Sequence, residues 1–105
     1  MARVVYPEAK YFKEIIDALG KLIDEVAFQL TQEGLVIKAL DPARVALIHI
    51  DLPMTAFIEY DVSEETIAGI STANLAKMLK RVKKGDRFVL SVEEDRVEVV
   101  IESIG

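Results

Sequence analysis

Two stretches of the sequence carry apolar residues at the three- and four-residue spacing of a helix. In the first, the spaced residues are Ala9, Phe12, Ile15, Ile16 and Leu19. Pro7 and Glu8 suit a first helical turn, and Gly20 suits the position just after a last turn. The pattern therefore predicts a helix between Pro7 and Gly20.

The second helical stretch begins at Ser71 or Thr72, either of which can cap a helix N-terminus. Its spaced apolar residues are Leu75, Met78, Leu79 and Val82. Gly85 is the first glycine after them, and we expect it to end this helix.

Elsewhere apolar and polar residues alternate, which predicts half-buried strands. The predicted strands are residues 2–6, 26–31, 35–40, 45–52, 57–60, 66–70, 88–92 and 97–101. In strand 45–52 the inner face is predicted to carry Ala46, Ile48, Ile50 and Leu52, and the opposite face Val45, Leu47, His49 and Asp51. Pro53 is expected to end that strand.

The order of these elements repeats along the chain. Residues 2–52 give strand, helix, strand, strand, strand, and residues 66–101 give strand, helix, strand, strand. The second unit lacks the last strand of the first. We therefore expect one truncated α+β domain over residues 1–105, with an unpaired sheet edge near its C-terminus.

Composition removes several classes of chemistry. The chain has 105 residues with no Cys and a single His, so disulfide frameworks, Cys zinc sites and multi-His metal sites are excluded. We find no signal peptide and no apolar run of transmembrane length, and we expect a soluble, intracellular protein. The many charges and few Asn, Gln and Cys residues suggest a thermophile.

The charge is acidic overall but locally basic. With 13 Lys and Arg against 18 Asp and Glu, the net charge is −5, which by itself argues against nucleic acid. Residues 71–84, however, contain five cations and no acid. Four of them, Lys77, Lys80, Arg81 and Lys84, fall on one face of the predicted second helix, opposite its apolar face. Both a phosphate-binding surface and a merely solvated face fit this pattern.

Other candidate sites each have an ordinary explanation beside the functional one. His49 and Asp51 form a conceivable catalytic pair, but no nucleophile accompanies them, and we favour an exposed strand histidine. The pairs Asp24-Glu25 and Glu64-Glu65 lack metal-ligand spacing and suit a solvated rim. We therefore expect no catalytic residue, metal or cofactor. Residues 40–47 combine apolar positions with a loop, which fits either a partner site or a covered strand end.

Several segments resemble the first domain of a known family, the archaeal and eukaryotic sliding clamp called proliferating cell nuclear antigen. They are Leu22-Ile23-Asp24-Glu25, Phe28, Gly34-Leu35, Ala39-Leu40-Asp41-Pro42-Ala43-Arg44-Val45-Ala46-Leu47-Ile48, Leu52-Pro53, Phe57, Tyr60, Gly69-Ile70, Leu75, Lys77 and Leu79-Lys80-Arg81. The resemblance implies two βαβββ units per domain, with helices on one face of curved antiparallel sheets. It also implies a non-enzymatic, three-subunit ring that encircles duplex DNA in the cytoplasm, on the nucleoid if the source is archaeal.

The resemblance also implies two sites and a set of partners. The DNA-facing residues would be Lys10, Lys13 and Lys21 on the first helix, and Lys77, Lys80, Arg81 and Lys84 on the second. Lys10, Lys13 and Lys21 share their side with Glu14 and Asp17, and many relatives carry a cation where this chain has Gly20, so the first helix would contribute less. A client-peptide groove would include Leu40, Arg44, Val45 and Leu47. Partners would be DNA polymerase, clamp loader, flap endonuclease and ligase.

The chain departs from this family in length, because family members carry a second domain. We therefore expect the isolated chain to be monomeric or to associate through its open edge, rather than to form the three-fold ring. Two alternatives remain open at this point. One is a stand-alone α+β module that binds a protein partner through residues 40–47, and the other is a small hydrolase using His49 and Asp51.

Overall fold

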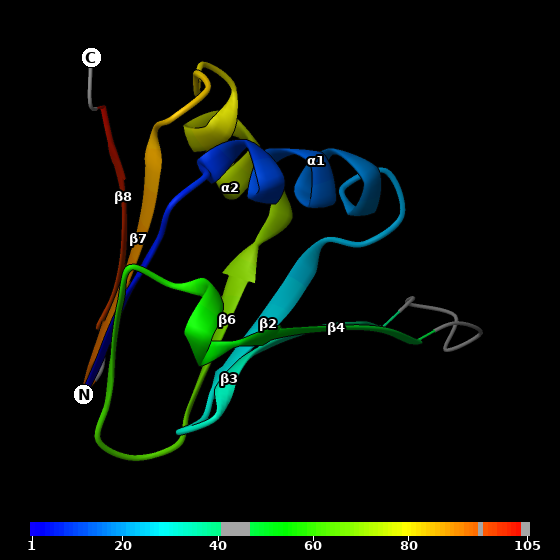
Figure 1. Ribbon diagram of the computed structural model, residues 1–105. Helices are drawn as coiled ribbons and strands as arrows, with labels where there is room; N and C mark the ends of the chain where they lie inside the picture. Colours follow the sequence, from blue (N-terminus) through cyan, green and yellow to red (C-terminus); the bar gives the residue numbers. More distant parts are fainter. Residues whose placement is uncertain (41–46, 95, 104–105) are drawn as a thin grey trace.

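The computed structural model describes residues 1–40, 47–94 and 96–103 (Figure 1). The elements in these residues are β1 (Ala2–Tyr6), α1 (Ala9–Leu19), β2 (Glu25–Leu30), β3 (Gly34–Leu40), β4 (Leu47–Pro53), the 3₁₀ turn η1 (Met54–Ala56), β5 (Glu59–Val62), β6 (Thr66–Ser71), α2 (Thr72–Leu79), β7 (Arg87–Glu93) and β8 (Arg96–Glu102). The two helices pack against each other in one layer, drawn at the top of Figure 1, and the strands extend below them. No helix in the described part of the chain is long and apolar enough to cross a membrane.

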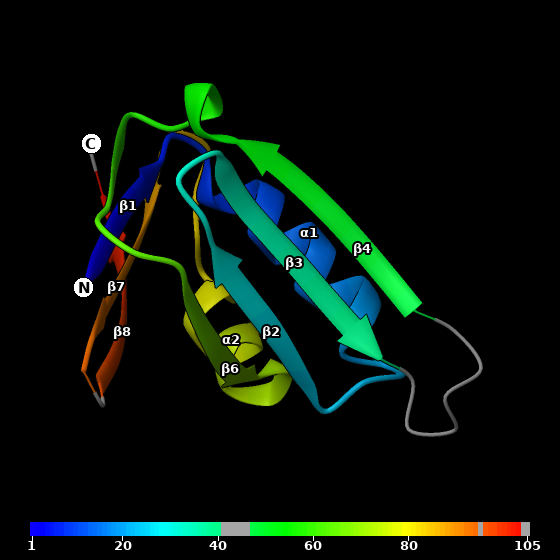
Figure 2. The ribbon, with the colours of Figure 1, turned by 90° about the horizontal axis from the view of Figure 1, so that it is seen from below.

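The strands form two antiparallel sheets of four, with the orders β5-β1-β7-β8 and β4-β3-β2-β6. The first strand of each repeat unit belongs to the sheet of the other unit, since β1 pairs with β7 and β6 pairs with β2 (Figure 2). This exchange ties the two units into one body with a shared core. The predicted α+β fold with two antiparallel sheets and two helices is confirmed.

The repeat of elements extends to corresponding positions within them. The pair Leu30–Leu35 in the first hairpin recurs as Val92–Val97 in the second, 62 positions later along the chain. Buried positions in and after the helices also correspond, 63 residues apart: Phe12, Ile16 and Leu19 of α1 match Leu75 and Leu79 of α2 and Val82 of the following turn. Within the described residues, β4 is the strand of the first unit that has no counterpart in the second.

Aromatic rings fill the centre of the core between the helices and both sheets. Phe12 of α1 stacks on Phe88 of β7, with 4.1 Å between ring centroids and 15° between planes. Phe28 of β2 lies 6.2 Å from Phe12 and 6.4 Å from Phe88. All three side chains are fully buried, so one cluster joins a helix to both sheets.

The first helix ends as predicted but begins slightly later. It starts at Ala9, with Glu8 as its N-cap residue in extended conformation, so Pro7 and Glu8 precede the helix instead of forming its first turn. The Glu8 side chain makes no cap hydrogen bond; it contacts a distant turn described below. The helix ends at Leu19, and the Gly20 N–H donates to the Ile16 carbonyl at 2.8 Å.

The prediction for the second helix is wrong at its C-terminal end. The helix stops at Leu79, six residues before Gly85, and Met78 is 43% exposed instead of facing the core. A turn replaces the last predicted helical turn, because the Lys83 N–H donates to the Asp86 carboxylate at 2.8 Å. At the other end Ser71 is the cap, as predicted: its hydroxyl accepts the Asn74 N–H at 3.2 Å.

Most strands follow the prediction, with one shift and one unexpectedly exposed apolar residue. Strand β5 begins at Glu59 and not at Phe57, because the 3₁₀ turn Met54–Ala56 ends with the Phe57 N–H bonded to the Met54 carbonyl. Strand β4 is described from Leu47 onward, so the predicted strand residues 45 and 46 lie outside the described residues. Val97, one of the alternating apolar residues of the predicted strand 97–101, is 42% exposed.

Candidate functional site

The predicted basic residues all lie on the helix side of the molecule. Some lie within a helix, some directly follow a helix, and some lie in a turn. Lys10 and Lys13 are on α1 and Lys77 is on α2, while Lys21 follows α1 and Lys80 caps α2. Arg81 and Lys84 belong to the turn after α2 and not to a helical face. All except the half-buried Lys13 are exposed.

This turn, residues 80–86, is held in place by two carboxylates. Asp86, 8% exposed, accepts the Lys83 N–H at 2.8 Å within the turn. Glu8 accepts the Gly85 N–H with 3.1 Å to each of its oxygens, and the Ala9 N–H donates to the Asp86 carbonyl at 2.8 Å. The start of α1 therefore fixes the turn that follows α2.

Gly85 allows the turn to close. Its φ is +94°, in the left-handed region where residues with a Cβ are strained. Lys83 is exposed on the same turn and was missed by the helical-face prediction, which placed it away from the other cations. The run Lys80-Arg81-Val82-Lys83-Lys84 before a glycine is the sequence signal that could have identified a basic turn.

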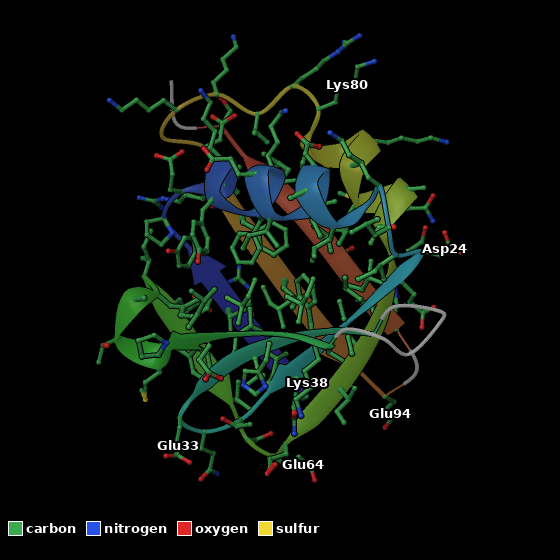
Figure 3. The ribbon with its side chains drawn as sticks, turned by 90° about the vertical axis from the view of Figure 1, so that its right-hand side faces the viewer. Asp24, Glu33, Lys38, Glu64, Lys80 and Glu94 are labelled. Carbon is green, nitrogen blue, oxygen red and sulfur yellow. The ribbon has the colours of Figure 1, made fainter. Side chains whose placement is uncertain are left out.

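The exposed charges near α2 and its following turn differ from those at the opposite end of the molecule, where Lys38 lies among several acids. Lys80 lies beside the helix layer in Figure 3, while Glu33, Glu64 and Glu94 lie toward the opposite end of the molecule. The α1 surface is mixed, as predicted, because Lys13 forms an ion pair with Asp17 at 2.9 Å. A chain of net charge −5 thus presents a local cationic surface around α2 and its following turn.

The second predicted site lies at the far ends of β3 and β4. Leu40 and Leu47 are opposite each other in the strand register, which brings the two ends of the predicted groove together. Arg44 and Val45 lie outside the described residues. The structure thus brings together the backbones of two of the four predicted groove residues.

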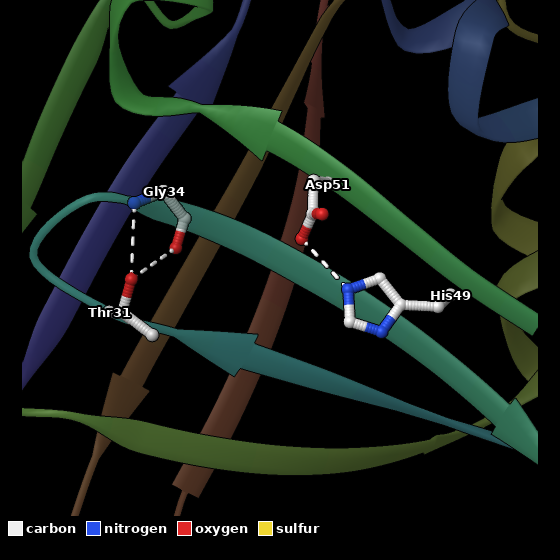
Figure 4. A network of polar contacts seen from close by, with 4 residues as sticks. All are labelled: Thr31, Gly34, His49 and Asp51. Atoms are coloured by element: carbon white, nitrogen blue, oxygen red, sulfur yellow. Dashed lines mark hydrogen bonds and ion pairs between the residues drawn. The ribbon is translucent and has the colours of Figure 1, made fainter.

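His49 and Asp51 are exposed on β4 and lie in hydrogen-bond contact, with 3.0 Å between Nε2 and Oδ1 (Figure 4). Their side chains are 47% and 70% exposed. The nearby Thr31 hydroxyl is engaged in its own turn, where it accepts the Glu33 and Gly34 N–H groups and donates to the Gly34 carbonyl. Because catalysis of this kind needs a nucleophile bonded to the histidine, the described geometry supports a surface pair and not a catalytic one.

The acidic pairs do not assemble into a metal site within the part of the chain that the structure describes. No three His, Cys, Asp or Glu side chains gather there in a way that could hold an ion. Two half-buried tyrosines have pKa values raised above the ordinary value. Burial raises the pKa of Tyr6, with a further contribution from Tyr11, and burial also raises the pKa of Tyr60.

Comparison with known proteins identifies relatives along nearly the whole chain. The family model "Proliferating cell nuclear antigen, N-terminal domain" matches residues 1–104. The DNA polymerase sliding clamp of Pyrococcus furiosus is 41% identical over 100 residues, covering 94% of this chain and 40% of the relative. DNA polymerase sliding clamp 1 of Aeropyrum pernix is 39% identical over 100 residues, covering 92% of this chain and 40% of the relative. The chain thus spans about two fifths of the length of these curated archaeal relatives.

Solved structures agree with this result. The PCNA of Thermococcus kodakaraensis has a TM-score of 0.86 at 31% identity, covering 96% of this chain and 42% of the other. The PCNA2–PCNA3 complex of Sulfolobus tokodaii has a TM-score of 0.88 at 33% identity, with 97% and 42% coverage. A structure of the C-terminal region of FEN-1 bound to A. fulgidus PCNA has a TM-score of 0.83 at 27% identity, with 99% and 42% coverage.

Proposed function

The chain belongs to the N-terminal domain family of proliferating cell nuclear antigen, and on that premise we propose that it forms part of a DNA sliding clamp. Such a clamp encircles duplex DNA and tethers replication and repair enzymes to it, in the cytoplasm of the cell. The family match over residues 1–104 is the observation that carries the proposal. The clamp acts by topology and binding and breaks no covalent bond.

The cationic surface is the part of this chain that faces DNA. Lys77, Lys80, Arg81 and Lys84 contact phosphates, and Lys10, Lys13 and Lys21 add weaker contacts because Asp17 already pairs with one of them. Phosphate contacts carry no sequence information and weaken with salt, so they guide DNA without fixing its position. The acidic residues at the opposite end repel DNA elsewhere on the surface.

The chain corresponds to most of the first of two domains in a subunit, and the complete subunits form a three-membered ring. Two observations support this part of the proposal. Strand β4 has no counterpart in the second repeat among the described residues, and the chain spans about two fifths of its relatives.

Client proteins bind where β3 ends and β4 begins, at the groove that includes Leu40, Arg44, Val45 and Leu47. The support comes from the family, since the C-terminal region of FEN-1 is bound to A. fulgidus PCNA in a matched structure. The ligand is a short client peptide that inserts a 3₁₀ turn with aromatic anchors. Polymerase, clamp loader, flap endonuclease and ligase are the partners we expect to carry it.

A chimeric clamp tests the DNA-facing surface. Residues 1–105 of this chain replace the corresponding part of the Pyrococcus furiosus clamp, and Lys77, Lys80, Arg81 and Lys84 are then all changed to Glu. We expect the variant to assemble into rings, measured by light scattering, but to lose clamp loading and stimulation of polymerase processivity.

A matched control uses one charge reversal on each side of the molecule. Lys80 lies beside the helix layer, and Lys38 lies on the sheet away from that layer, as Figure 3 shows. The substitutions Lys80→Glu and Lys38→Glu change the net charge of the chain by the same amount. Only Lys80→Glu should weaken DNA-dependent activity. Unchanged processivity in the fourfold variant would show that these residues do not face DNA.

A further inference from the structure

Glu8 lies where the start of α1 meets the turn of residues 80–86, here called the basic turn. It is the N-cap residue of α1, but its side chain does not cap that helix. The carboxylate instead accepts the Gly85 N–H, with 3.1 Å to each of its two oxygens. Because a single oxygen is enough to accept one N–H, an amide oxygen in the same place can accept this bond as well.

The Glu8 side chain is one of three contacts that hold the basic turn. The Ala9 N–H donates to the Asp86 carbonyl at 2.8 Å, and the Lys83 N–H donates to the Asp86 carboxylate at 2.8 Å. Both of these bonds stay when the Glu8 side chain is changed. A substitution at position 8 should therefore leave the chain folded and release the turn at one point, Gly85, whose φ is +94°.

Four exposed cations extend from the segment that this contact holds. They are Lys80, Arg81, Lys83 and Lys84, and the last of them directly precedes Gly85. Side chains on a loose backbone lose conformational entropy when they bind phosphates, and that loss weakens binding. A backbone that is already held in place avoids part of this loss. The hydrogen bond from Gly85 to Glu8 therefore favours phosphate binding by the turn.

The negative charge of the same carboxylate acts in the opposite direction. Glu8 is half-buried and contacts the amide group that follows Lys84, so it places an anion inside a cationic surface. An anion there lowers the positive potential that a phosphate meets. A neutral acceptor at position 8 would hold Gly85 without opposing the cations. The hydrogen bond and the charge of Glu8 can thus be separated by substitution.

We propose that Glu8 is a positioning residue that sets how strongly the basic turn binds DNA. Its hydrogen bond to Gly85 holds the turn in place, and its charge keeps the attraction to phosphates moderate. Moderate attraction suits a ring that must move along DNA, because tighter phosphate contacts would slow it. This inference rests on the proposed function, since it takes Arg81 and Lys84 to face DNA.

Two neutral variants at position 8 test the two effects in the chimeric clamp. Glu8→Gln removes the charge and keeps an oxygen for the Gly85 N–H, whereas Glu8→Ala removes both. The affinity for a labelled linear duplex is measured at several salt concentrations. Hydrogen exchange of the peptide that contains residues 80–86 is measured by mass spectrometry. Because the two variants carry the same charge, a difference between them reports the hydrogen bond alone.

The two variants should differ from each other in affinity, salt dependence and exchange. We expect Glu8→Gln to bind the duplex roughly twofold more tightly than the unmodified chimera at low salt, with an unchanged salt slope. Glu8→Ala should bind roughly threefold more weakly than Glu8→Gln, with a shallower salt slope, because fewer phosphates are neutralised. Exchange in residues 80–86 should become faster in Glu8→Ala and stay the same in Glu8→Gln.

Glu33→Gln is the charge-matched control, because Glu33 lies at the opposite end of the molecule from Lys80 (Figure 3). It should change neither duplex affinity nor exchange in the basic turn. Equal affinity and equal salt slope for the two Glu8 variants, while the fourfold charge reversal still abolishes duplex binding, would overturn this proposal and leave the DNA-facing surface standing. Unchanged duplex binding in the fourfold variant would overturn the DNA-facing surface and this proposal with it.

Discussion

The Glu8 carboxylate accepts the backbone N–H of Gly85, 77 residues further along the chain, with 3.1 Å to each oxygen. Glu8 is the N-cap residue of α1, and Gly85 belongs to the turn that follows α2. The contact therefore joins the ends of two helices that belong to different repeats. It also fixes the backbone from which Arg81, Lys83 and Lys84 extend.

Removing this carboxylate should loosen the turn. We expect Glu8→Ala to lower the free energy of unfolding by about 1 kcal/mol, since a partly buried hydrogen bond to a charged acceptor is lost. Glu14→Ala, an exposed acid on the same helix, should change it by less than about 0.5 kcal/mol. Urea unfolding of both variants measures the difference. Equal effects would mean that the Glu8–Gly85 contact contributes nothing.

The backbone conformation of Gly85, and not the space around it, should decide how well this position tolerates substitution. No atom lies within 4 Å of a Cβ added there, but φ is +94°. We expect Gly85→Ala to destabilise the protein by about 1 kcal/mol, and Gly85→Asn by less, because Asn enters the left-handed region more readily. Thermal unfolding of the two variants gives the order. Ala more stable than Asn would contradict a backbone cause.

Local patterns predicted the strands because alternation fixes which side chains share a face. The pairs Leu30–Leu35 and Val92–Val97 follow from such alternation on each side of a short turn, and both hairpins form. The same alternation could not predict the burial of Val97. Burial depends on a neighbouring strand, and β8 has a described neighbour on one side only.

The length of α2 could not be predicted from spacing alone. Val82 is 8% exposed and sits at helical spacing from Leu79, yet it reaches the core from a turn. The turn depends on Asp86 and on the distant Glu8, and a helical pattern contains no sign of either contact. For the candidate site, the DNA-facing cations stay a prediction, and the structure corrects the placement of Arg81 and Lys84, which lie in a turn and not on a helix. The client groove stays a prediction.

Two tyrosines should make the protein less stable in alkali. Burial raises the pKa of Tyr6 and of Tyr60, and the Tyr60 hydroxyl donates to the Thr31 carbonyl at 2.5 Å. The folded chain thus holds these protons more tightly than the unfolded chain does. The stabilisation is complete below the unfolded pKa of about 10 and is lost as pH rises through the folded values.

Phenylalanine at both positions should flatten this dependence. We expect the free energy of unfolding of the unmodified chain to fall above about pH 10, and that of the Tyr6→Phe/Tyr60→Phe variant to fall less. Near neutral pH the variant should be less stable by about 1 kcal/mol, because the bond to Thr31 is lost. Denaturant titrations across this pH range provide the measurement. Parallel curves would show that other groups cause the alkaline loss.

The two repeats should respond differently to the same truncation. Leu35 and Val97 occupy equivalent positions in the two hairpins, but Leu35 is 0% exposed and Val97 is 42% exposed. We expect Leu35→Ala to lower the free energy of unfolding by about 3 kcal/mol and Val97→Ala by less than about 1 kcal/mol. Urea unfolding of the two variants measures both losses.

Leu35→Val provides the matched comparison, because it puts the same residue type at both positions. The further loss from Leu35→Val to Leu35→Ala then removes the same atoms as Val97→Ala does. We expect the step at position 35 to be the larger one, since it leaves a cavity enclosed by β2, β4 and the core, whereas solvent already reaches position 97. Equal steps at the two positions would mean that enclosure by neighbouring strands does not set the size of the loss.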